Sequence, residues 1–166
     1  MHRRLPATYY RRVTTYRGTH MEVTVTQESA SPATATMTQN QNYVEVRLPA
    51  DGAYLSVLRT ATAGLAARLD FTLDEIEDLR IAVDEACALL LRQPVADSPL
   101  TCLFNLTKDG MEVTVSAATI NGQPPARDNF AWTVLTALAG DVKSFVDDEK
   151  TVHITLWKRR SIPGAV

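Results

Sequence analysis

The sequence predicts an α+β fold, a two-layer sandwich in which helices pack on one face of a mostly antiparallel sheet. Apolar residues recur at helical spacing in two consecutive segments, about 55–70 and 72–91, which lie between segments with the alternation of strands. Two of these strands, 101–107 and 111–117, are joined by a Lys-Asp-Gly sequence typical of a hairpin. Helices inserted between hairpin-forming strands indicate two layers, because each layer must bury its apolar face against the other.

Each remaining element has a local signal. Alternating apolar and polar residues predict a strand that begins at Tyr43. The second helix is expected to start at Thr72, because Glu75 stands at the capping-box spacing three positions later. The elements expected after the hairpin are a helix from 130 to Gly140 and strands at 142–146 and 152–156.

The first 42 residues are predicted to form a mostly disordered basic and polar tail, ahead of one domain at 43–160 and a short tail at 161–166. The N-terminal region is rich in Arg, Thr, Ser and Gln and has few large apolar residues to bury. A weak alternation from Glu22 to Thr26 leaves an edge strand open, and Met21 is an alternative translational start.

Composition limits the classes of function. The chain has 166 residues, of which 45% are hydrophobic and 22% charged, as in ordinary globular domains. A net charge of −2 argues against a domain that neutralises nucleic-acid phosphates, although arginines gather before Glu22 and basic residues at 158–160. Cys87 and Cys102 lack metal or redox spacing, and no apolar run suits a membrane helix. We therefore expect a cytoplasmic protein without direct nucleic-acid or membrane contact.

Two adjacent acids, Asp84 and Glu85, stand in the apolar half of the second predicted helix. Burying them is costly unless they are paired or face a cleft. The residues alone leave two explanations open: a structural one, with an arginine partner or solvent at the helix edge, and a functional one. The sequence otherwise lacks a P-loop, a His-Glu-x-x-His motif and a nucleophile elbow.

Four stretches, at 69–72, 79–87, 132–142 and 154–159, resemble motifs of one family. They are similar to the RsbW-like anti-sigma factors, serine kinases of the histidine-kinase/Hsp90-like (GHKL) ATPase superfamily, and most of all to the actinobacterial, UsfX-type branch. The likeness covers about 43–160 and implies the GHKL sandwich. It agrees with the order of elements derived above.

The resemblance also implies where a nucleotide site would lie. Asp84 and Glu85 fall in the family's N-box, with Glu85 at the position of the general base for serine phosphorylation. Leu89 stands where the family has its Mg²⁺-binding asparagine. Because leucine offers no oxygen ligand to a hard cation, no metal site is expected.

Two further parts of the family's site are replaced. Ala117 lies in the region where the family has an adenine-reading aspartate. Asp128 and Asn129 replace the second glycine box, and either is a natural helix cap that would satisfy backbone amides otherwise free for phosphate. We expect no cofactor, or weak ATP or ADP binding without efficient turnover.

By this resemblance the chain is expected to be an anti-sigma factor, a homodimer that sequesters an alternative sigma factor until a STAS-type anti-anti-sigma protein releases it. The alternative is an ATP-dependent serine kinase acting on that antagonist, and a basic-tailed nucleic-acid binder ranks last. Arg59 falls on the family's partner-binding position in the first helix. Without the family, a solvated helix arginine is the simpler interpretation of Arg59.

Overall fold

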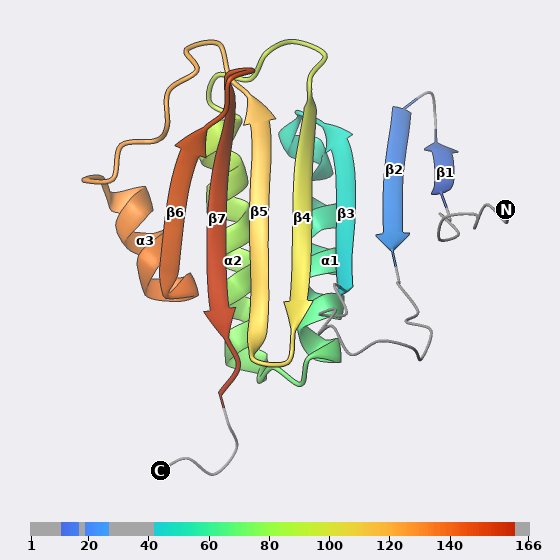
Figure 1. The fold of residues 1–166 in the computed structure, drawn as a ribbon, viewed down its shortest axis with the longest axis vertical. Helices are drawn as coiled ribbons and strands as arrows, with labels where there is room; N and C mark the ends of the chain where they lie inside the picture. Colours follow the sequence, from blue (N-terminus) through green and yellow to red (C-terminus); the bar gives the residue numbers. More distant parts are fainter. Residues whose placement is uncertain (1–10, 17–18, 27–41, 162–166) are drawn as a thin grey trace, which may run out of the picture.

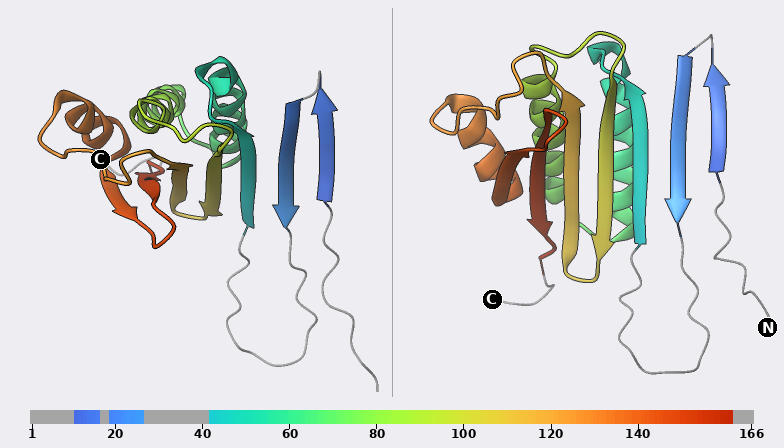
Figure 2. Two further views of the ribbon diagram at one scale, coloured as in Figure 1. Left: turned by 90° about the horizontal axis from the view of Figure 1, so that it is seen from above. Right: turned by 45° about the horizontal axis from the view of Figure 1, so that its top comes forward.

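The computed structural model describes residues 11–16, 19–26 and 42–161. Its sheet has seven antiparallel strands in the order β1-β2-β3-β4-β5-β7-β6. Three α-helices pack on one face of this sheet, and the other face carries no helix from the described residues (Figure 1; Figure 2, left). The predicted two-layer α+β sandwich is therefore confirmed.

From Tyr43 onward, the helices and strands occur in the predicted order. The strands are β1 (Arg11–Tyr16), β2 (Thr19–Thr26), β3 (Asn42–Pro49), β4 (Pro99–Thr107), β5 (Gly110–Ala118), β6 (Asp141–Val146) and β7 (Thr151–Arg159). The helices are α1 (Leu55–Arg68), preceded by a 3₁₀ turn at Gly52–Tyr54, α2 (Leu73–Leu90) and α3 (Phe130–Ala139). Among the described residues, no helix is long and apolar enough to cross a bilayer.

Two strands lie where the sequence predicts a disordered tail. β2 pairs with β3 in a register that runs from Glu22 opposite Arg47 to Thr26 opposite Tyr43, and β1 pairs with β2. The edge of β3 offers unpaired backbone groups, and the four consecutive β-branched residues at 23–26 favour extended backbone. Residues 1–10, 17–18, 27–41 and 162–166 lie outside the described part of the chain, so the domain boundaries at residues 43 and 160 stay predictions.

The core fills the space between the sheet and the helices. Along β4 and β5 alternate side chains are fully or nearly fully buried, as the alternation predicts. The hairpin between these strands also forms as predicted. Gly110 is required there, because a Cβ at this position would lie 2.2 Å from the carbonyl oxygen of Lys158 on β7. The buried residues of the hairpin are Leu100, Cys102, Phe104, Leu106, Met111, Val113, Val115 and Ala117.

The predicted capping residues are found at the helix ends. Of the two candidate caps at the start of α3, the structure uses one. The Thr72 hydroxyl accepts a hydrogen bond from the Glu75 amide, and the Glu75 carboxylate accepts one from the Thr72 amide at 2.7 Å, which completes the capping box. At the start of α3 the cap is Asn129 and not Asp128. Gly140 ends α3 with φ of 91°, a value that favours glycine.

Candidate functional site

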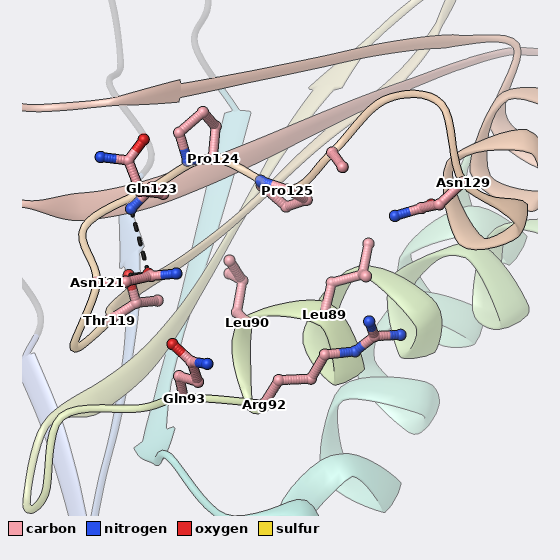
Figure 3. Close-up of a pocket in the computed structure, with 11 residues that line it drawn as sticks. Leu89, Leu90, Arg92, Gln93, Thr119, Asn121, Gln123, Pro124, Pro125 and Asn129 are labelled. Atoms are coloured by element: carbon pink, nitrogen blue, oxygen red, sulfur yellow. Dashed lines mark hydrogen bonds between the residues drawn. The ribbon is translucent and has the colours of Figure 1, made fainter.

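A pocket of about 240 Å³ lies at the C-terminal end of α2. The last turn of α2 forms one side, the segment just after β5 forms another, and the loop that leads to α3 covers it (Figure 3). The pocket lies between the central helix and the loop before α3, and it includes two of the six residues that the family resemblance implies for a nucleotide site. The lining residues are Leu89, Leu90, Arg92, Gln93, Thr119, Asn121, Gln123, Pro124, Pro125, Ala126 and Asn129.

The loop over the pocket is anchored by Arg127. Its guanidinium donates a 2.9 Å hydrogen bond to the backbone oxygen of Ser144 on β6 and lies 5.4 Å from the centre of the Trp132 ring. At the other end of the loop, the Ile120 amide donates to the carbonyl oxygen of Gln93 at 2.9 Å. These bonds fix the loop at both ends, so the pocket walls are held by the fold.

Two of the predicted nucleotide-site residues line this pocket. Leu89 is only 8% exposed and forms part of its apolar wall, where the family's magnesium ligand would stand. The Asn129 side chain accepts a 2.9 Å hydrogen bond from the Trp132 amide. That amide is therefore already satisfied by the protein.

The other four predicted residues lie elsewhere. Ala117 is buried on the core side of β5, and Asp128 is exposed beside the pocket without lining it. Asp84 and Glu85 are half-buried at least one helical turn before the pocket. Of the six predicted nucleotide-site residues, only Leu89 and Asn129 line this pocket together.

Asp84 pairs with Arg59, which joins α2 to α1. The Arg59 Nε donates to Asp84 Oδ2, and the two side chains are 46% and 25% exposed. The other oxygen, Asp84 Oδ1, is buried and accepts no hydrogen bond from the described residues. The arginine partner that the sequence left open for this acid is thus present, and it is the residue predicted to bind a partner protein.

The comparisons with known proteins decide the family. No family model matches the chain. The chain is 36% identical over 124 residues to a protein named anti-sigma-F factor RsbW from Mycobacterium tuberculosis, and the match covers 71% of this chain and 74% of that protein. It belongs to the RsbW family. It is also 35% identical over 83 residues to serine-protein kinase RsbW from Bacillus subtilis, which covers 48% of this chain and 52% of that relative.

The pocket of this RsbW-family protein does not suit a magnesium–nucleotide complex. Its lining contains no carboxylate, and Leu89 offers no oxygen ligand. The backbone amide that would approach a phosphate at the start of α3 is capped by Asn129. Among the described residues, no three His, Cys, Asp or Glu side chains are placed to hold a metal ion.

Neither cysteine offers reactive chemistry. Burial raises the pKa of the Cys87 thiol to about 12, and burial likewise raises the pKa of Cys102 well above its ordinary value. Both thiols are buried within the core. They are protonated at neutral pH and pack as small apolar groups.

A second polar cluster lies on the sheet face away from the helices. Ser116 and His153 Nδ1 are 2.8 Å apart, and His153 Nε2 lies 3.1 Å from Asp147. Asp147 also accepts a 2.8 Å hydrogen bond from the Thr151 amide, which closes the turn between β6 and β7. Phe145 stacks on the imidazole with 4.4 Å between ring centres. This network ties β5, β7 and the turn together.

Sequence reasoning missed most of the residues that line the pocket. Gln93, Asn121 and Gln123 line the pocket, but the sequence predicts only turns and loops where they lie. Such segments carry no periodicity from which a position can be assigned. The available signal is compositional, namely three side-chain amides in two short loops that flank the predicted hairpin.

Proposed function

We propose that this chain is an anti-sigma factor that binds an alternative sigma factor and withholds it from RNA polymerase. A STAS-type anti-anti-sigma protein releases the sigma factor by binding the same chain. Membership of the RsbW family supports this function, since relatives are named anti-sigma-F factor RsbW. The observation that carries the proposal is that the whole domain is retained while its pocket lacks the groups that hold a magnesium nucleotide.

The competing function is an ATP-dependent serine kinase that phosphorylates the antagonist. Relatives named serine-protein kinase RsbW favour it, and Glu85 keeps the family's general-base position. Phosphoryl transfer depends almost entirely on positioning and on charge neutralisation by metal ions and donors. The apolar Leu89 and the capped amide at α3 remove parts of that machinery. Protein binding alone needs neither.

Arg59 is the proposed contact residue on the sigma-binding face of α1. Its guanidinium makes one ion pair, with Asp84, and nearly half of the side chain remains exposed. An arginine has several N–H donors in a planar fork, so the pair with Asp84 leaves others for a partner. The ion pair also holds the guanidinium in one orientation, which lowers the entropy lost when a partner binds.

We also propose that the protein acts as a cytoplasmic homodimer, as the family resemblance implies. The mass of the purified full-length chain, measured by light scattering over a range of concentrations, tests the dimer. A monomer at concentrations well above that needed for sigma-factor binding contradicts it.

The decisive experiment is affinity capture of the full chain from its native host, followed by identification of bound proteins. We expect a sigma factor to copurify equally before and after nucleotide is removed by an ATP-hydrolysing enzyme. The matched control is the Arg59→Ala chain. Loss of the complex on nucleotide removal, or transfer of labelled γ-phosphate from ATP to the copurified antagonist, favours the kinase instead.

A further inference from the structure

The pocket at the end of α2 presents hydrogen-bond donors whose orientation is fixed by the protein. The Oδ1 of Asn121 accepts from the Gln123 amide and from the Thr119 hydroxyl, both at 3.2 Å. The Oδ1 of Asn129 accepts from the Trp132 amide. With both oxygens engaged, the NH₂ groups of these two side chains point into the pocket from opposite sides (Figure 3).

The charge of the lining has one sign. Arg92 is the only charged residue among the side chains that line the pocket, and it lies just after Leu91, the C-cap of α2. Gln93 and Gln123 carry amides that can also turn a donor inward. No carboxylate competes for these donors within the lining. The pocket therefore favours a ligand that accepts hydrogen bonds and carries negative charge.

The remaining walls are apolar and the space is small. Leu89, Leu90, Pro124 and Pro125 form the surfaces between the polar groups. A volume of about 240 Å³ is below the roughly 300 Å³ at which pockets for drug-sized ligands begin. A ligand that uses both the donors and the walls has one anionic group on a compact apolar body.

We propose that this pocket binds a small organic anion, a carboxylate or a phosphate monoester on a compact apolar body, without a metal ion. The anionic group accepts hydrogen bonds from donors of the lining, namely the NH₂ group of Asn121 or Asn129 and the guanidinium of Arg92. The apolar body packs on the leucine and proline walls. This is a different ligand class from a magnesium nucleotide, for which the lining offers no carboxylate and has Leu89 at the position of the family's metal ligand.

Two pairs of probe compounds test the proposal. Benzoate and neutral benzamide share a shape and differ in charge, whereas phenyl phosphate and inorganic phosphate share the anionic group and differ in the apolar ring. In ¹⁵N-labelled protein we expect benzoate and phenyl phosphate to shift the side-chain NH₂ signals of Asn121 and Asn129, whereas benzamide leaves them in place. Inorganic phosphate should bind more weakly than phenyl phosphate. Equal binding of benzoate and benzamide, or of the two phosphates, overturns the proposal.

The chain offers variants that remove donors and keep the loop. Asn121→Asp and Asn129→Asp retain the oxygens that accept from the Gln123 and Trp132 amides, and aspartate caps helices as well as asparagine does. They exchange each inward NH₂ for a carboxylate oxygen. We expect the double variant to bind benzoate about tenfold more weakly or worse, because an unpaired negative charge now faces the anion. Thermal unfolding should stay close to that of the parent.

Arg92→Gln should weaken benzoate binding, while Arg68→Gln, on exposed α1 surface, should not. Parent-like affinity in the double aspartate variant, or tighter binding of ATP with Mg²⁺ than of phenyl phosphate, contradicts the proposal. All of these measurements use the chain without a partner. Their failure therefore leaves the anti-sigma function untouched, and loss of sigma-factor binding leaves the anion site untouched.

Discussion

The two ends of α2 are built in opposite ways. At the N-terminal end the carboxylate of Glu75 closes the capping box with Thr72 and also accepts hydrogen bonds from the amide and hydroxyl of Ser161, at 2.8 and 2.6 Å. At the C-terminal end the helix stops beside an open pocket under a loop. The comparison teaches that hydrogen bonds from distant segments concentrate at the start of α2, the closed end, although Glu75 and Ser161 also line a hollow of about 470 Å³ there. The last turn of α2, the open end, instead borders the pocket under the loop.

The last residues of β7 and the residues just after it contact the helices near the closed end. Lys158 Nζ lies 3.0 Å from Asp78 on α2 and 2.6 Å from the backbone oxygen of Leu138 at the end of α3. Arg160 reaches Asp70, between α1 and α2, at 3.6 Å. One short segment thus contacts α2, the last turn of α3 and the junction between α1 and α2.

The largest expected effect comes from breaking the closed end with Glu75→Ala. The variant loses the hydrogen bonds to Thr72 and Ser161 around a carboxylate that is only 8% exposed. We expect the free energy of unfolding, measured in urea, to fall by about 2–3 kcal/mol.

The matched control is Glu77→Ala, half a turn further along α2. Glu77 is 58% exposed and forms one surface ion pair, with Arg80. Its loss should be about 0.5 kcal/mol or less. Equal losses in the two variants would remove the distinction between the closed end and an ordinary helix surface.

Next in size is the effect of Arg59→Ala on sigma-factor binding. We expect the complex to weaken by about 1–3 kcal/mol, the range for truncating a charge-assisted interface contact. Unfolding should change by less than about 1 kcal/mol, because the ion pair with Asp84 is partly exposed. Calorimetry of the purified pair, with and without ATP, gives both the size of the loss and its independence of nucleotide.

Asp84→Asn tests whether Arg59 acts by contacting the sigma factor or depends on the orientation that its ion pair with Asp84 gives it. It removes the ion pair and keeps the Arg59 side chain, so it should weaken binding less than Arg59→Ala does. If the parent and Arg59→Ala chains bind the sigma factor equally well, α1 is not the contact surface at this position.

A smaller effect is expected from pH. Burial raises the pKa of Glu75, but hydrogen bonds from Ser161 and Thr72 outweigh burial and bring the pKa from 4.5 down to about 2. The unfolded chain binds this proton more readily than the folded one. The stabilisation by Glu75 is therefore complete above pH 4.5 and is lost as the pH falls toward 2.

The test compares urea unfolding of the parent and Glu75→Gln between about pH 5 and pH 3. The parent should lose more stability over this range than the variant. Asp147, whose pKa is lowered by its hydrogen bond with His153, contributes to both chains alike. Parallel pH profiles would show that the Glu75 carboxylate is not linked to folding in this way.

The smallest expected effect belongs to Leu89→Asn at the open end. Restoring this amide alone should produce neither magnesium-dependent ATP binding nor phosphotransfer, because Ala117 and the Asn129 cap remain. Calorimetry with ATP and Mg²⁺, together with a labelled-phosphate assay on the antagonist, measures both. A Kd near the micromolar range would show that the pocket needs only one residue to regain its nucleotide.

Local signals account for what the sequence predicts well. The capping box of Thr72 and Glu75, the hairpin turn and the end of α3 at Gly140 each depend on residues a few positions apart. Pairings between distant residues carry no such signal, so neither Ser161 on Glu75 nor Arg59 on Asp84 could be assigned beforehand. The sequence indicates only that a buried acid needs a partner.

The pocket was predictable in place and not in content. Family motifs located it through Leu89 and Asn129, which do line it. Its donors are the side-chain amides of Asn121 and Asn129. Their orientation depends on hydrogen bonds donated by Thr119 and Trp132. Such orientation arises only after the strands and α3 are in place, and no spacing rule encodes it.

The position of β7 has a consequence for synthesis of the chain. β7 follows the other described strands in the chain, yet it lies between β5 and β6 and leads directly into Ser161. Until it emerges from the ribosome, β5 has an open edge, β6 has no neighbour and α2 lacks part of its cap. Such long-range closure is slow and leaves apolar surface exposed meanwhile. A chain that stops before β7 therefore lacks the pairing partner of both β5 and β6 and leaves part of the sheet unformed.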